Sequence, residues 1–231
     1  MRILALESSA VAASAALLTD GELTASVFQS AGLTHSTTLM PMCADMLAGC
    51  GLSVSDVDLI AVARGPGSFT GIRIGVAAAR GLAWGAEKPC CGVSTLEAMA
   101  MPLAFMEGAV VCCAMDARRS QVYNALFSAE GGRLVRLVPD RAISLEELGE
   151  ELKNTEKRVI IVGDGAKLCY NALRPVSDRL ALAPAPLLLQ SAYGVALAAA
   201  DEEKRSEPVP NYLRKSQAER EREARLAAQG S

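Results

Sequence analysis

Residues 64–84 constrain the fold more than any other part of this chain. They follow an apolar run, residues 59–63, that is typical of a buried strand, and they pass through a glycine-rich turn into a helix of small residues. Glycines at such a turn permit left-handed backbone conformations and close approach of another group. The first N–H groups of the following helix point into the turn, where they can hold an anion. The segment therefore predicts an α/β layer with an anion-binding turn at Gly65, Gly67 and Ser68.

Strand-like and helix-like segments alternate along the chain in two cycles, which predicts two α/β lobes. The first lobe would comprise residues 1–106, and the second, smaller lobe residues 107–231, ending in a charged helix or frayed tail at 214–225. Residues 175–186 have no regular pattern. The expected strands are 2–6, 11–18, 22–28, 59–63, 90–93, 109–115, 121–127 and 159–162, and the expected helices are 36–50, 71–84, 95–106, 145–152, a segment ending at 173, and 191–200.

Composition and charge exclude several classes of protein. A hydrophobic content of 51% excludes a disordered chain, and a net charge of −3 gives no global signal for nucleic acid. The seven cysteines form no Cys-x-x-Cys unit, so a zinc or redox motif lacks support. An odd cysteine count and the lack of a signal peptide predict a reducing, cytoplasmic location. No apolar run is long enough to cross a bilayer, which takes about 20 residues.

Several segments together resemble one bacterial family. They are residues 64–84, with their Gly-Pro-Gly-Ser-Phe-Thr-Gly turn, and residues 92–100, joined by 3–9, 35–42, 114–118 and 210–214. The chain is similar in these segments to the TsaB (YeaZ) family, whose members are non-catalytic partners in making threonylcarbamoyladenosine in tRNA. The resemblance is dense up to about residue 127 and thin afterwards.

The resemblance implies the actin-like ATPase fold, which has two α/β lobes. In that superfamily the turn after the first strand faces nucleotide phosphates, and the matching positions here are Glu7, Ser8 and Ser9. Where TsaB-type chains generally have aspartate, this chain has Glu7. These three residues, with the glycine-rich turn, form a candidate nucleotide or anion site. A buried carboxylate satisfied by backbone N–H groups is the alternative interpretation.

Two positions after the fifth expected strand exclude the catalytic activity of the related TsaD-type enzymes. Those enzymes carry two histidines four residues apart on a helix, a spacing suited to a metal ion. The corresponding positions here are Thr95 and Met99, and the only histidine in the sequence is His35. We therefore expect no catalytic residues and no metal site in this chain.

The helix stripes indicate a partner interface. Gly71, Gly75 and Ala79 form a flat stripe that would let another helix approach closely. The alternative interpretation is that both helices simply cover the sheet. The preceding helix has apolar side chains that share one face, and its methionines suit a surface that repacks against a partner. TsaB-like proteins are thought to pair with TsaD through these two helices. The expected interface residues are Leu39, Met42, Met46, Leu47, Gly71, Arg73, Gly75 and Ala79.

The resemblance thus implies a scaffold subunit of the complex that transfers a threonylcarbamoyl group to tRNA. Its partners would be a TsaD-type catalytic subunit and a TsaE-type ATPase, with tRNA bound only through the complex. A homodimer is a further option. No cofactor is expected on this subunit alone, although ATP or ADP could bind at the boundary of the complex. The alternatives are a free-standing actin-like phosphotransferase and an M22-type peptidase.

Overall fold

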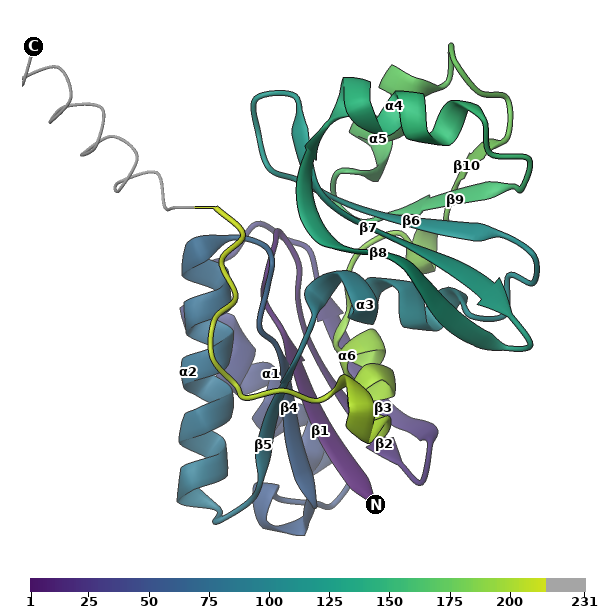
Figure 1. Cartoon of the computed structure of the whole chain (residues 1–231). Coiled ribbons are helices and arrows are strands. Elements are labelled where there is room, and N and C mark those ends of the chain that lie inside the picture. The colour runs from purple at the N-terminus through teal and green to yellow at the C-terminus, as the bar shows by residue number, and fades with distance from the viewer. Residues whose placement is uncertain (215–231) are drawn as a thin grey trace, which may run out of the picture.

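The computed structural model describes residues 1–214, which fold into two lobes that each contain one five-stranded mixed sheet (Figure 1). The first sheet has the order β3-β2-β1-β4-β5 and the second the order β8-β7-β6-β9-β10. The first sheet consists of β1 (Arg2–Glu7), β2 (Ala13–Thr19), β3 (Glu22–Gln29), β4 (Leu59–Ala63) and β5 (Cys90–Val93). The second consists of β6 (Val110–Asp116), β7 (Gln121–Glu130), β8 (Arg133–Ser144), β9 (Val159–Val162) and β10 (Leu180–Leu182).

The two sheets repeat one topology. In each, three antiparallel strands form a meander, and a fourth strand then pairs in parallel with the first. The fifth strand pairs in parallel with the fourth, and a helix connects the two. Asp20 and Gly21 join β2 to β3 with φ of 51° and 88°, as expected for a primed hairpin turn. The predicted two-lobed α/β architecture is therefore confirmed.

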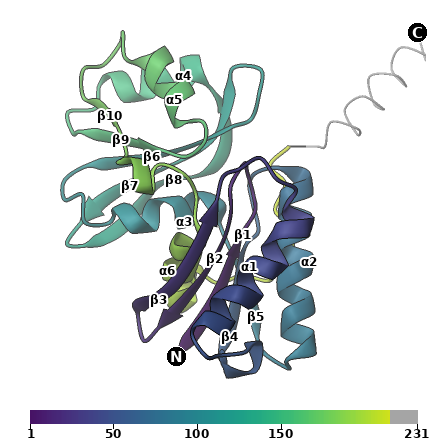
Figure 2. The ribbon, with the colours of Figure 1, turned by 180° about the vertical axis from the view of Figure 1, so that it is seen from behind.

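Helices cover both faces of each sheet, so the molecule is built in layers (Figures 1 and 2). Helices α1 (His35–Gly49) and α2 (Phe69–Gly85) cover the side of the first sheet that is turned away from the second sheet. Helices α4 (Leu145–Lys153) and α5 (Ala166–Leu173) cover the corresponding side of the second sheet. Between the sheets lie α3 (Thr95–Ala100) and α6 (Ala192–Ala200). No helix in residues 1–214 has an apolar stretch long enough to cross a membrane.

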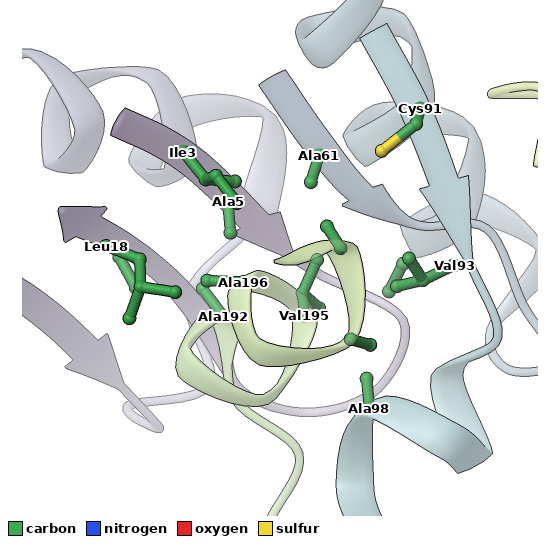
Figure 3. Packing of buried hydrophobic residues seen from close by; sticks show 14 of the residues in the cluster. Ile3, Ala5, Leu18, Ala61, Cys91, Val93, Ala98, Ala192, Val195 and Ala196 are labelled. Carbon is green, nitrogen blue, oxygen red and sulfur yellow. The ribbon is translucent and has the colours of Figure 1, made fainter. Parts of the chain in front are cut away.

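Helix α6 belongs to the first lobe, although the expected boundary at residue 106 assigned it to the second. Helix α6 packs against β1 and β2, and Val195 and Ala196 share a core with Ile3 and Ala5 (Figure 3). A Cβ atom at Gly194 would lie 2.0 Å from the carbonyl oxygen of Ala98, so α6 also contacts the backbone of α3 closely. Residues 107–214 therefore do not form one lobe, because α6 completes the core of the first lobe. Most of the charged helix or tail expected at 214–225 lies outside the described residues.

Two strands of the second sheet were missing from the expectation. Strand β8 carries several charged residues and alternates half-buried with exposed positions at the edge of the sheet. Strand β10 has only three residues and lies in the segment expected to be irregular. Pairing with β7 and β9, respectively, makes these segments strands, and their own composition does not. The helix expected at 95–106 is also shorter, since α3 ends at Ala100 and a 3₁₀ turn, Met101–Leu103, follows.

Candidate functional site

The glycine-rich turn between β4 and α2 is packed against the turn that follows β1. Gly65 has a φ of 119°, and a Cβ atom there would lie 2.4 Å from the carbonyl oxygen of Asn211. A Cβ atom at Gly67 would lie 2.4 Å from the carbonyl oxygen of Ser9. Ser68 caps α2, since its Oγ accepts a hydrogen bond from the N–H of Gly71 at 3.3 Å. Glycine is thus required here because neighbouring backbone occupies the space of a side chain.

At the expected anion-binding turn, some hydrogen-bonding groups are already paired within the chain. The N–H of Ser68 donates to the carbonyl oxygen of Ser9 at 2.6 Å, and Ser8 Oγ donates to the carbonyl oxygen of Gly71 at 2.9 Å. The structure therefore brings the predicted residues Glu7, Ser8, Ser9, Gly65, Gly67 and Ser68 together. The N–H of Ser68, however, already has an acceptor within the protein.

Glu7 is a fully buried carboxyl group at the end of β1. Its Oε1 accepts the N–H of Ser9 at 2.5 Å, and its Oε2 has no protein partner among residues 1–214. Burial raises the pKa of Glu7 to about 7, and the charge of Asp164 adds to this. Asp164, which follows β9, has a pKa raised to about 6 by burial and by the charge of Asp116. These acids come from both lobes, so protonation of either one changes the charge within the seam between them.

A cleft of about 550 Å³ opens between the two lobes beside these acids. Its first-lobe wall is the beginning of α2, and its second-lobe wall is the region around the turn between β6 and β7. The final described segment of the chain closes one side. Residues that line it include Ser9, Ser68, Phe69, Asp116, Arg118, Tyr123, Asp164, Tyr212 and Arg214. The cleft therefore combines aromatic rings, arginines and carboxyl groups.

Residues 205–214 cross the first lobe as an extended strap alongside α2 (Figure 1). Ser206 exchanges two backbone hydrogen bonds with Gly92 on the edge strand β5, at 2.8 and 2.9 Å. The N–H of Asn211 donates to the carbonyl oxygen of Arg64 at 2.7 Å. At the end of the strap, Arg214 donates to the carbonyl oxygen of Ala117 in the second lobe at 2.9 Å. The strap therefore covers the free edge of the first sheet and reaches across the mouth of the cleft.

Arg73, expected at the partner interface, is exposed but held by residues of its own chain. Its guanidinium lies 3.8 Å from the centre of the Phe69 ring, and its Nε donates to the hydroxyl of Tyr212 at 2.9 Å. The rings of Phe69 and Tyr212 are stacked with centroids 4.4 Å apart. Arg73 thus fastens the strap to α2.

The other predicted interface residues point in a different direction from the one expected. Leu39, Met46, Leu47, Gly71, Gly75 and Ala79 are buried against the first sheet, and Met42 is half-buried. A Cβ atom at Gly75 would lie 2.5 Å from Ser8 Oγ and 3.4 Å from a methyl group of Val62. The small-residue stripe therefore brings α2 close to β1 and β4. The expectation that this stripe faces a partner is wrong.

The opposite sides of α1 and α2 are exposed and also rich in small residues. Met40, Ala44 and Ala48 are exposed on α1, and Ala77, Gly81 and Trp84 on α2. Trp84 is 87% exposed, and a Cβ atom at Gly81 would meet nothing within 4 Å. We call these six residues the outer face. Sequence spacing alone does not show which side of each helix faces the sheet, because α1 and α2 carry small or apolar residues on more than one side.

Thr95 and Met99 stand on α3 at the positions expected for a TsaD-type metal pair. Both are buried, and Met99 packs against the second sheet. Within residues 1–214 no three His, Cys, Asp or Glu side chains are grouped as metal ligands would be. The places of the paired histidines are thus occupied by two buried side chains, of which Met99 belongs to the hydrophobic core.

Ion pairs that connect the two lobes, which we call the ionic brace, were not expected from the sequence. Arg136 on β8 lies 2.6 Å from both Glu97 on α3 and Asp140, and Ser94 donates to Asp140 at 2.5 Å. The Arg136 guanidinium also lies 4.6 Å from the centre of the Phe127 ring. No local signal marks these residues, because their partners are up to 46 positions apart in the sequence.

Comparison with known proteins identifies the family. The model for "TsaD: tRNA N6-adenosine threonylcarbamoyltransferase" matches residues 29–221. The tRNA threonylcarbamoyladenosine biosynthesis protein TsaB of Bacillus subtilis is 36% identical over 73% of this chain and 73% of its own. TsaB of Escherichia coli is 38% identical over 71% and 72%, respectively. This chain belongs to the TsaB family.

Solved structures agree with this assignment. YeaZ from Pseudomonas aeruginosa is 30% identical, with a TM-score of 0.76 over 92% of this chain and 99% of that one. The ethanolamine utilization protein EutJ from Carboxydothermus hydrogenoformans is 14% identical with a TM-score of 0.51, a likeness of fold alone. The actin-like fold expected for this TsaB-family chain is confirmed.

Proposed function

We propose that this chain is a non-catalytic subunit of a tRNA threonylcarbamoyl-transfer complex and binds a TsaD-type catalytic subunit. The observation that carries the proposal is the similarity to proteins named for tRNA threonylcarbamoyladenosine biosynthesis, at 36% and 38% identity over nearly three quarters of the chain. In this complex the TsaD-type partner would move the threonylcarbamoyl group from its adenylate to adenosine in tRNA.

The residues at the two positions that correspond to the TsaD-type histidine pair support a non-catalytic role. Thr95 and Met99 cannot replace a histidine pair as ligands of a hard or borderline metal ion, and both side chains are buried. The only histidine, His35, instead lies 2.7 Å from the carbonyl oxygen of Ala10 through its Nε2. A phosphotransferase is less well supported, because the N–H of Ser68 at the candidate phosphate turn is bonded within the chain.

We place the TsaD-type partner on the outer face of α1 and α2. Ala44, Ala48, Ala77 and Gly81 make this face shallow enough for another helix to approach, which increases dispersion contacts. Trp84 supplies one large apolar side chain of the kind that dominates binding energy at interfaces. The burial of Met46 and Gly75 removes them from this surface but leaves the two helices as the docking element.

The remaining features of the complex are part of the same proposal. A TsaE-type ATPase would be the third subunit, tRNA would be bound by the assembly, and ATP or ADP would bind at the boundary between subunits. A homodimer formed through the outer face would compete with the TsaD-type partner. A tRNA-modifying assembly of this kind would work in the cytoplasm.

The test uses a variant that changes the outer face and leaves the fold intact. Gly81→Arg places a long cation where the glycine has open space, and arginine favours a helix more than glycine does. Asn171→Arg, at an exposed position of α5, adds the same side chain on the far lobe as a control. We expect Gly81→Arg to abolish co-elution with the TsaD-type subunit in size-exclusion chromatography and to lower threonylcarbamoyladenosine in tRNA, while Asn171→Arg behaves as wild type.

Two results would contradict the proposal. Undiminished complex formation by Gly81→Arg would move the partner away from the outer face. Threonylcarbamoyl transfer by the purified chain alone, without any partner, would refute the non-catalytic role.

A further inference from the structure

Four arginines gather around the mouth of the interlobe cleft. Arg118 and Arg214 line the cleft, and Arg119 follows in the same turn between β6 and β7. Arg73 reaches the site through its hydrogen bond to Tyr212, which also lines the cleft. We call Arg73, Arg118, Arg119 and Arg214 the arginine rim.

The rim arginines differ from those that stabilise the fold. Arg136, Arg141 and Arg205 each lie within 3.1 Å of a carboxylate of the chain. Within residues 1–214, none of the four rim side chains forms an ion pair with an acid. The nearby exposed carboxylate, Asp116, accepts the backbone N–H of Arg118 at 2.6 Å. The rim therefore places four guanidinium groups around a cleft that is also lined by Asp116 and Asp164, on a protein whose net charge is −3.

The turn that carries Arg118 and Arg119 has an unusual backbone. Arg118, Arg119 and Ser120 have φ of 62°, 54° and 56°, a left-handed conformation that side chains with a Cβ atom adopt at a cost. Both arginines are exposed, and no hydrogen bond from either guanidinium to residues 1–214 is present. The turn thus presents two unpaired guanidinium groups to solvent.

Two aromatic side chains lie beside one of these cations, Arg73. The Arg73 guanidinium lies 3.8 Å from the centre of the Phe69 ring and 5.8 Å from that of the Tyr212 ring, and the two rings stack on each other. Tyr212 is 38% exposed. Guanidinium groups suit phosphate, which they bind through two parallel hydrogen bonds, and exposed aromatic rings suit stacking of unpaired bases. The combination matches RNA better than an acidic protein surface, which would not use the rings.

We propose that the arginine rim binds the phosphate backbone of the RNA substrate directly. This inference rests on the proposed function, since it assigns one part of tRNA binding to this subunit. It departs from the sequence-based expectation that tRNA is bound only through partner subunits. Because the interaction is with phosphates, the rim contributes affinity and orientation, and it reads no base sequence.

The test measures tRNA binding by the assembled complex as a function of salt concentration. The rim variant is Arg118→Ala/Arg119→Ala, and the control is Lys153→Ala/Arg174→Ala, which removes two exposed cations from the α4 and α5 side. With an unmodified tRNA transcript, the rim variant should bind roughly tenfold more weakly. Its slope of log affinity against log salt should be smaller by about 1.4–1.8, as expected for two lost phosphate contacts. Arg118→Lys/Arg119→Lys should recover most of the slope, because counterion release depends on charge.

Formation of the wild-type complex is measured first, so that failure of the proposed function appears as the lack of any complex. Failure of the present inference would appear as an intact complex whose tRNA affinity and salt slope are equal in the rim and control variants. Loss of complex formation by the rim variant would also overturn it, because the rim would then be a protein interface.

Discussion

Two glycines on the same helix are predicted to respond to alanine in opposite directions. Gly71 and Gly81 are both in α2, but Gly71 faces the turn after β1 and Gly81 faces open space. A Cβ atom at Gly71 would lie 2.1 Å from the carbonyl oxygen of Ser8, so the backbone must move by about 1 Å to restore an ordinary contact. At Gly81 the same atom meets nothing within 4 Å.

The magnitudes follow from these distances. Overpacking at Gly71→Ala costs about 1–3 kcal/mol, and weakening of the hydrogen bond from Ser8 Oγ to the Gly71 carbonyl oxygen costs about 1 kcal/mol more. Gly81→Ala should stabilise α2 by about 0.5–1 kcal/mol, because alanine loses less backbone entropy in a helix. At about 2–4 °C per kcal/mol for a chain of this size, Tm should fall by roughly 4–16 °C for Gly71→Ala and rise by about 1–4 °C for Gly81→Ala.

Thermal unfolding followed by circular dichroism, with both variants in one buffer, measures the two shifts. A Tm for Gly71→Ala equal to or above that of Gly81→Ala would refute the packing of the small-residue stripe against β1. The stripe would then again be a candidate for the partner interface.

Two other predictions concern a buried carboxyl group and a buried methionine. The pKa of Glu7 is raised from 4.5 to about 7, so the folded state retains a proton that the unfolded state releases, and stability should fall as pH rises from about 4.5 to 7. Glu7→Gln should remove this dependence, which is on the order of 2–3 kcal/mol, and urea unfolding at pH 5 and pH 8 measures it; an unchanged pH dependence would contradict the burial of Glu7. Met46→Asp should unfold the first lobe, since it buries a charge at a cost of several kcal/mol, whereas the exposed Met40→Asp should stay folded and weaken partner binding. Circular dichroism and size-exclusion chromatography separate the two effects, and a stable Met46→Asp variant would show that α1 is oriented differently.

Local pattern was sufficient for the family, the two lobes and most elements of the first lobe. The turn at residues 64–71 and the replacement of a histidine pair by Thr95 and Met99 are properties of short segments, so no knowledge of distant contacts is needed to interpret them. The hairpin at Asp20 and Gly21 is of the same kind, because its residue types favour the left-handed backbone that it adopts.

Tertiary structure alone decided which side of each helix is free. Helices α1 and α2 carry small or apolar residues on two sides, so periodicity permits either side to face the sheet. The choice depends on the close approach of Gly71 and Gly75 to Ser8, more than 60 positions away, which leaves Gly81 and Trp84 outside. The strap and the ionic brace likewise depend on pairing between distant segments, since their residues gain partners only when the two lobes and residues 205–214 meet. The arginine rim depends on the same meeting, because α2, the turn between β6 and β7, and the strap each contribute to it.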